Sequence, residues 1–264
     1  MKSTPEQIED IKKDGYSIDF SNVFDYAFEN YKKIAVYSGI IMLILTIVFF
    51  ILFTLLGTIY GDLKGWSDNL VKLLGNQDTA STEFLILTIS ITFITALFTP
   101  FGAGFLKMAQ YADKDQKFSF SSIFSYYKPP YVFPLFSAAF ILGVVSSGIN
   151  YLLESLGVSY LGSALSLFIS YFTFFTIPLI VFGNLSVFDA IKSSVILVSK
   201  NPLTIFGLFI IGYIGSVVGV VVCVVGIFFT AVFNTSITYA AYFSIFDDEE
   251  KRDPIDSIGR SDLE

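Results

Sequence analysis

The sequence predicts an all-α protein, a polytopic transmembrane helical bundle of about six spans. Three observations support this fold class: the composition is apolar, charge is missing from long stretches, and basic residues concentrate in alternate connections. Charged residues are 15% of the 264 residues and mean hydropathy is +0.69, whereas soluble domains carry roughly 25% charged residues. Five stretches hold no charged residue: 34–61, 84–106, 129–153, 155–188 and 201–246.

The uncharged stretches set the number of spans, because about 20 apolar residues cross the roughly 30 Å of hydrocarbon in a bilayer. Four of them accommodate one span each, near 34–60, 84–106, 130–153 and 159–182. The fifth, 201–246, would be about 69 Å long as a single helix at ~1.5 Å per residue, so we expect two spans, near 203–222 and 226–246. The turn between them, near Val221–Gly226, is unusually apolar. A re-entrant segment there stays an alternative to a full hairpin.

The distribution of basic residues predicts the orientation. Five lie before the first span, four in the second-to-third connection, two after the fourth span and three in the tail, whereas the opposite side holds only Lys64 and Lys72. The positive-inside rule then places both termini in the cytoplasm, and we expect a multi-pass protein of the bacterial cytoplasmic (inner) membrane. The first 33 residues are too polar for a cleaved leader, and the acidic residues 247–264 are expected to form a disordered cytoplasmic tail.

A short marker, an apolar residue followed by Phe, precedes each odd-numbered span: Val23-Phe24, Ile123-Phe124 and Val187-Phe188. Each marker opens a stretch in which apolar residues recur at helical spacing. A helix of this kind beside a span lies in the headgroup plane. We therefore expect three cytoplasmic in-plane amphipathic helices, near 20–33, 119–128 and 186–199. The architecture becomes three units, each an in-plane helix followed by a transmembrane hairpin.

Polar residues inside the expected spans are the candidates for a cavity or a polar helix interface: Thr92, Thr95, Thr99, Asn150 and Asn234. The threonines recur at spacings of three and four, on one face of a helix. A buried Asn in hydrocarbon needs a partner, so each Asn predicts an interhelical hydrogen bond or a wet cavity. Close helix packing is the simpler interpretation, and a polar-lined passage is the functional one. Pro100 and Pro178 interrupt otherwise helical spans and are expected to kink them.

The residues that the chain lacks weigh against catalysis. His is absent, which removes the commonest general base and the commonest zinc ligand. None of the expected spans holds Asp, Glu, Lys or Arg at bilayer-centre depth, where proton-coupled carriers and charged-filter channels usually need them. We find no catalytic triad, metal cluster, cofactor motif or nucleotide motif, and the net charge of −7 gives no footprint for nucleic acid. We therefore expect neither an enzyme nor a cofactor.

Two segments carry a resemblance to known proteins. Gly102–Tyr127 combines the end of a span, a charged turn and an aromatic helix, and Phe188–Leu208 has an Ala-Ile-Lys-Ser-Ser helix leading into a new span. Both are similar to uncharacterised bacterial six-span membrane families of unknown function. Those families include the membrane domain fused to some glycerophosphodiester phosphodiesterases. The resemblance implies a polytopic inner-membrane protein, carries over no catalytic residue, and does not imply the phosphodiesterase activity, because the chain lacks the soluble domain.

From these observations we expect a structural or accessory membrane protein that binds partner proteins or lipids. The alternative is a transporter or lipid-handling protein for an uncharged or amphiphilic substrate. A cavity lined by the candidate residues would favour the alternative, and tight packing of those residues would favour the first hypothesis. The sequence leaves the substrate, the partner and the oligomeric state open.

Overall fold

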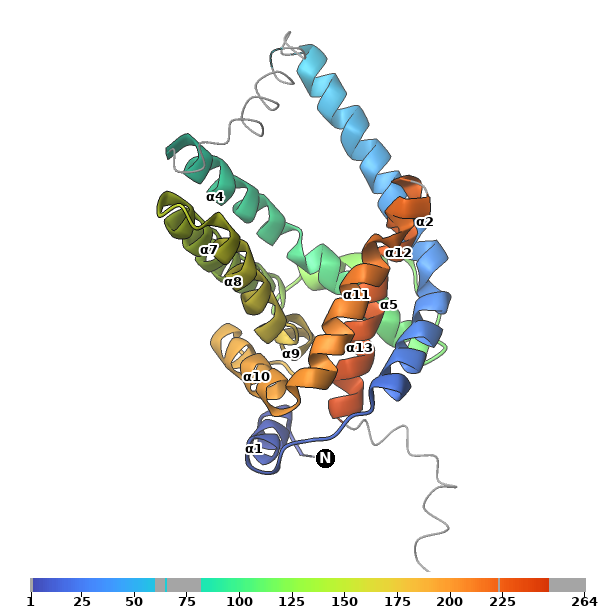
Figure 1. Cartoon of the computed structure of the whole chain (residues 1–264). Coiled ribbons are helices and arrows are strands. Elements are labelled where there is room, and N and C mark those ends of the chain that lie inside the picture. The colour runs from blue at the N-terminus through green and yellow to red at the C-terminus, as the bar shows by residue number, and fades with distance from the viewer. Residues whose placement is uncertain (1, 60–64, 66–81, 223, 247–264) are drawn as a thin grey trace, which may run out of the picture.

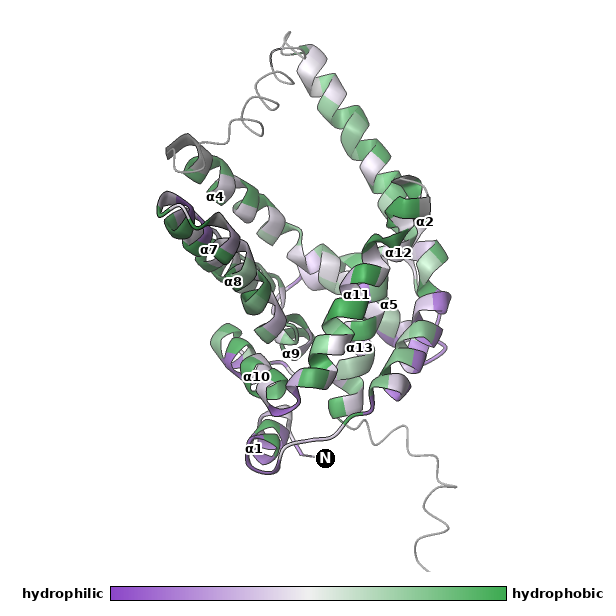
Figure 2. Cartoon of the chain, viewed as in Figure 1, coloured by the Kyte–Doolittle hydropathy of each residue, from purple (hydrophilic) through white to green (hydrophobic). Residues whose placement is uncertain are grey.

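The computed structural model describes residues 2–59, 65, 82–222 and 224–246, and this part of the chain is all-helical (Figure 1). Five helical segments are long and apolar enough to cross a membrane: Phe20–Ile59, Leu85–Asp113, Val132–Ser155, Tyr160–Val181 and Pro202–Val221. Large apolar side chains cover their outer surfaces, with Phe49 and Phe50 65% and 66% exposed. Hydrophilic residues gather instead at the end that holds the N-terminal helix (Figure 2). These are the features of a membrane protein.

The helices form three successive pairs, each made of a continuous helix and a broken one. The continuous helices are α2 (Phe20–Ile59), α7 (Val132–Ser155) and α11 (Pro202–Val222). The broken ones are α4 (Thr82–Leu97) with α5 (Thr99–Asp113), α8 (Ser159–Phe172) with α9 (Thr176–Val181), and α12 (Ile227–Thr230) with α13 (Phe233–Ile245). The short 3-10 helix η2 (Val224–Gly226) precedes α12.

The first pair is not a closed hairpin. α2 packs against α5 and α13, whereas α4 packs against α7, which in turn packs against α8. Toward one end the outer half of α2 therefore diverges from the arm made by α4, α7 and α8 (Figure 1). The arrangement of three closed hairpins that the sequence predicts is thus present only in part.

The prediction of a separate in-plane helix at 20–33 is wrong, because these residues form the first part of α2, which runs without a break for 40 residues. No Pro or Gly occurs between Phe20 and Ser38, so nothing local ends the helix before the span. Its apolar face also packs on protein, since Val23 and Ala27 are 1% and 0% exposed within the main core. The amphipathic pattern here marks a helix buried against the bundle.

The other two amphipathic helices form close to the expected bounds. The stretch 119–128 becomes α6 (Phe120–Ile123) and the 3-10 helix η1 (Phe124–Tyr127), and 186–199 becomes α10 (Val187–Lys200). Pro129 and Pro130 follow the first, and Pro202 follows the second. Proline lacks the N–H that would continue a helix, which explains why these two end where the first does not.

Helix α1 (Thr4–Asp14) was not predicted. Its first turn carries a reciprocal capping box between Ser3 and Glu6, the arrangement that satisfies two free N–H groups at a helix start. Ile8 and Ile11 are buried, and α1 packs against α10. The Tyr16 hydroxyl then donates to the Leu197 carbonyl at 2.9 Å, and burial raises the pKa of this phenol.

The sixth expected span, 226–246, is not one long helix. It is divided into η2, α12 and α13, the last of 13 residues. The chain nevertheless returns along α11 and α2, and α13 ends near the start of α2 (Figure 1). Residue 223 in the preceding turn and the expected tail 247–264 lie outside the described residues.

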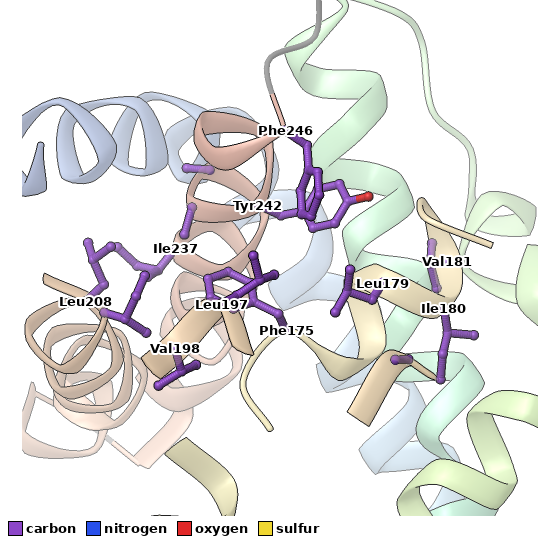
Figure 3. Close-up of a cluster of buried hydrophobic side chains, with 14 of the residues drawn as sticks. Phe175, Leu179, Ile180, Val181, Leu197, Val198, Leu208, Ile237, Tyr242 and Phe246 are labelled. Atoms are coloured by element: carbon purple, nitrogen blue, oxygen red, sulfur yellow. The ribbon is translucent and has the colours of Figure 1, made fainter. Parts of the chain in front are cut away.

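The core lies at the end where the three pairs converge. Side chains from α9, α10, α11 and α13 meet there, among them Phe175, Leu179, Leu197, Leu208, Ile237 and Tyr242 (Figure 3). Phe175, Leu179, Leu197 and Ile237 are all 0% exposed. This packed end holds the broken helices in place around the cavity described next.

Candidate binding cavity

A cavity of about 560 Å³ lies where the three broken helices approach one another. The breaks occur at Phe98 between α4 and α5, at 173–175 between α8 and α9, and at 231–232 between α12 and α13. The cavity is lined by Thr99, by Thr173 and Thr176, and by Asn234, which belong to or closely follow these three breaks. Its volume is in the range of about 300–1,000 Å³ found for ligand sites. α7 and α11 supply the remaining wall.

Two of the three breaks follow from proline, as the sequence predicts. Pro100 is the second residue of α5 and Pro178 is the third residue of α9, where the missing N–H cannot bond to the carbonyl four residues earlier. The third break has no proline and is held from α11. The Ser216 hydroxyl lies 3.3 Å from the Ala231 carbonyl, and it accepts from the Asn234 backbone N–H at 3.1 Å.

Most hydroxyl groups of the cavity wall donate to their own helices. Thr173 donates to the Ile169 carbonyl at 2.7 Å, Thr238 to the Asn234 carbonyl at 2.8 Å, and Ser170 to the Ser166 carbonyl at 3.0 Å. A hydroxyl that has given its proton away retains lone pairs that accept. These oxygens therefore offer acceptors to a molecule in the cavity.

Thr176 is different, because its hydroxyl oxygen is buried and has no hydrogen-bond partner among the described residues. A helical Thr ordinarily donates to the carbonyl four residues earlier, here that of Phe172. That carbonyl already accepts from the Ser194 hydroxyl at 2.8 Å, and the same Ser194 oxygen accepts from the Phe175 N–H at 3.0 Å. Ser194 on α10 thus bridges the second break. Thr176 is the first residue of α9, so the residue four positions earlier lies on the far side of the non-helical segment 173–175.

Asn234 brings an amide to the same cavity from the first turn of α13. Its backbone is bonded to Ser216 and Thr238, whereas its side chain makes no hydrogen bond within the described part of the chain. The side-chain oxygen lies against Gly212 of α11, where a Cβ would collide with it. The absence of a side chain at Gly212 therefore lets the amide lie between α11 and the cavity.

The structure brings together only two of the five residues that the sequence singled out. Thr99 and Asn234 line the cavity. Thr92 packs between α4 and α7, 3.4 Å from the Ser147 hydroxyl, and Thr95 is exposed and donates to the Ile91 carbonyl. Asn150 joins α7 to α8 by donating to the Ser166 hydroxyl at 2.5 Å. For Thr92 and Asn150, the packing interpretation describes the observed contacts.

Sequence reasoning missed Thr176 and Thr238. Thr176 carried one usable signal, since it stands two residues before Pro178 in an expected span. No group of three or more His, Cys, Asp or Glu side chains gathers in the described part of the chain. None of the residues lining the cavity is ionisable.

Outside the cavity, a group of polar contacts joins α2 and α13 to α5 and the residues just after it. Asn30 is 3% exposed; its amide donates to the Ala109 carbonyl at 2.8 Å, and its oxygen accepts from Ser236 at 3.2 Å. Nearby, Lys33 pairs with Asp115 at 2.6 Å and the Tyr239 hydroxyl bonds to Asp113 at 3.1 Å. These contacts fix the end of the bundle at which the basic residues concentrate.

No protein-family model, curated protein or solved structure matches this chain. The resemblance to six-span bacterial families therefore stays a prediction.

Proposed function

We propose that this membrane protein binds an uncharged or amphiphilic ligand, such as a lipid, in the cavity at the three helix breaks. The unpartnered Thr176 hydroxyl is the observation that carries the proposal. A buried hydroxyl without a hydrogen bond costs about 1–3 kcal/mol, and a ligand in the cavity would recover that cost. Lipid handling or transport is thus favoured over a purely structural role.

The broken helices support the same interpretation. Irregular backbone at membrane depth is tolerated where it lines a cavity, and discontinuous helices build the substrate sites of many membrane transporters. All three second helices are interrupted, and residues at or just after each break line one cavity.

The ligand is proposed to be uncharged because the cavity wall offers no compensating charge. A charged group in a low-dielectric site needs a charged or strongly polar partner. Hydroxyls and one amide are suited to a neutral polar group.

Filling the cavity tests the proposal. Ala139 on α7 lines the cavity, and an A139W substitution would occupy part of it. Val145 on the same helix is 47% exposed, so V145W is the matched control on the outer surface. We expect native mass spectrometry of the purified protein to show a retained amphiphile in the wild type and in V145W, and loss of it in A139W. Equal retention by all three proteins would contradict the proposal.

We further propose that the protein lies in the bacterial cytoplasmic membrane with both termini in the cytoplasm. The excess of basic residues in alternate connections supports this orientation. The return of α12 and α13 toward the start of α2 supports an even number of crossings (Figure 1).

A structural or accessory role is the second candidate, and one observation favours it. The outer half of α2 forms an apolar groove of about 510 Å³ with Phe98, Phe101, Phe124 and Tyr127. A spanning helix of a partner membrane protein would fill such a groove. Crosslinking from a photoreactive residue at Phe49 should then give one stoichiometric partner; lipid adducts alone would count against this role.

A further inference from the structure

The polar cavity adjoins an apolar groove of about 650 Å³ between α7, α8 and α10. The two share Leu142, Ile169 and Thr173 as lining residues. Away from this shared wall the groove is lined by residues such as Leu165, Phe168 and Val195. Their side chains are 44%, 60% and 39% exposed, so the groove opens on the outer surface of the bundle.

The cavity and the groove therefore lie next to each other, with only Leu142, Ile169 and Thr173 between them. The cavity offers hydroxyls and an amide among apolar side chains such as Leu106 and Phe209, whereas the groove is lined almost entirely by aliphatic and aromatic carbon. A molecule that occupies both needs a compact polar part joined to an apolar chain. In a bilayer, a membrane lipid has this form.

The hydrogen-bonding groups of the cavity specify the polar part further. Thr173, Thr238 and Ser170 have donated their protons to carbonyls of their own helices, so they act as acceptors. Thr176 keeps its proton and can donate. A ligand group that matches both kinds of hydroxyl must donate and accept, as an alcohol does. Phosphate and ester groups only accept, and a phosphate would also bring charge into a wall that has no ionisable residue.

We propose that the ligand is an uncharged lipid with a free hydroxyl in its head group. Its hydroxyl bonds to Thr176 in the cavity, and one acyl chain lies in the groove between α7, α8 and α10. This inference rests on the proposed function and adds the class of ligand and the place of its chain.

The test uses a diacylglycerol with a diazirine in one acyl chain, added to the full-length protein in nanodiscs. We expect light to attach the probe to peptides of α8 and α10. Unlabelled diacylglycerol should compete about tenfold better than its O-acetyl ester, which lacks only the hydroxyl, since one hydrogen bond is worth about 1 kcal/mol or slightly more. Free glycerol should not compete.

Two variants test where the hydroxyl and the acyl chain of the ligand bind. T176V removes the hydroxyl that bonds to the ligand and should weaken competition by diacylglycerol, while the labelling that remains shows that the variant is folded. V195W should block the groove and reduce labelling of α8 and α10. V217W, on the outer surface of α11 where Val217 is 41% exposed, should leave labelling unchanged.

The outcomes separate the inference from the proposed function. Stronger competition by phosphatidic acid with the same chains, or competition by glycerol alone, would overturn the ligand class while leaving the cavity a binding site. Labelling that is insensitive to every competitor would overturn the inference. Retention of a native amphiphile by A139W would overturn the proposed function as well.

Discussion

Asn30 and Thr176 are both buried polar side chains, but only Asn30 has its hydrogen bonds formed. This difference distinguishes a polar residue that stabilises the fold from one that is available to a ligand. Asn30 is bonded through both ends of its amide, and it joins three helices. Thr176 is 1% exposed and has no bond from its hydroxyl within the described residues. A fully bonded group stabilises the empty protein, whereas an unbonded one stabilises it only when a ligand is present.

Replacing Thr176 by Val should therefore raise the stability of the empty protein. Val keeps the shape and removes the unpaired hydroxyl, so we expect the free energy of unfolding to rise by about 1 kcal/mol. Thermal unfolding after delipidation in detergent measures the change. T173V is the matched control: its hydroxyl donates to the Ile169 carbonyl, and its removal should not stabilise. A lower melting temperature for T176V than for the wild type would contradict the prediction.

Replacing Asn30 by Ala should lower the stability of the protein. The substitution leaves the Ala109 carbonyl and the Ser236 hydroxyl without their bonds to the amide, and we expect the free energy of unfolding to fall by about 1–3 kcal/mol. Asn22 lies exposed on the same helix, so N22A is the control and should change stability by less than about 0.5 kcal/mol. Equal melting temperatures for the two variants would show that the Asn30 contacts do not stabilise the bundle.

Part of the cavity could be predicted from sequence at the level of single residues. Thr99 and Asn234 are polar residues in apolar stretches, and that pattern alone singles them out. Thr176 differs from Thr92 and Thr95 in sequence only by the nearby Pro178, which predicts a kink and not an unbonded hydroxyl. Its unbonded state arises directly after the break at 173–175, which Ser194 bridges from a helix further along the chain. No local pattern contains that contact.

Helix boundaries follow local chemistry at some places and tertiary contacts at others. Pro100, Pro178 and Pro202 mark breaks that the sequence contains, and the absence of Pro and Gly from Phe20 to Ser38 explains the unbroken start of α2. The break at 231–232 has no such marker. It depends on Ser216 of α11, which bonds to Asn234 across the pair. The sixth span was therefore expected as one helix and is found in pieces.

Ser194 should control the second break. S194A removes the bond to the Phe172 carbonyl and the acceptor of the Phe175 N–H, so we expect destabilisation by about 1–3 kcal/mol. It also removes the two bonds that bridge the break next to Thr176, which should weaken retention of a bound amphiphile. Unfolding in detergent and native mass spectrometry measure the two effects.

The neighbouring Ser193 provides the control for Ser194. It is 7% exposed and makes no hydrogen bond through its side chain within the described residues, so S193A should alter neither property appreciably. Identical behaviour of S193A and S194A would show that the break does not depend on the Ser194 hydroxyl.

The complete bundle combines a packed, hydrophilic end with diverging apolar arms (Figure 2). The membrane environment and the all-helical fold could be predicted because both depend on composition and stretch length. The divergence of α2 from α4 could not be predicted, because it depends on which neighbouring helices α2 and α4 each pack against. On α4, Thr92 lies 3.4 Å from Ser147 of α7, and a threonine row in the sequence predicts a polar contact without identifying the partner helix.

Cysteine labelling can establish the topology of the bundle in the membrane. In a C223S background, single cysteines at Ser155, Gln116 and Ser244 probe the α7–α8 turn, the connection after α5 and the end of α13, all at exposed positions. We expect an impermeant maleimide applied to intact cells to label S155C. Q116C and S244C should react only after the membrane is permeabilised, because the positive-inside rule keeps their ends in the cytoplasm.

Ser244 is the decisive position. If α12 and α13 cross the membrane as a broken span, S244C behaves as Q116C does, and the Asn30 contacts lie toward the cytoplasmic end of the bundle. If the segment is re-entrant and returns to the outer side, S244C reacts in intact cells together with S155C. That result would remove the sixth crossing and separate the two termini, and it would be incompatible with the observed packing of α13 beside the start of α2.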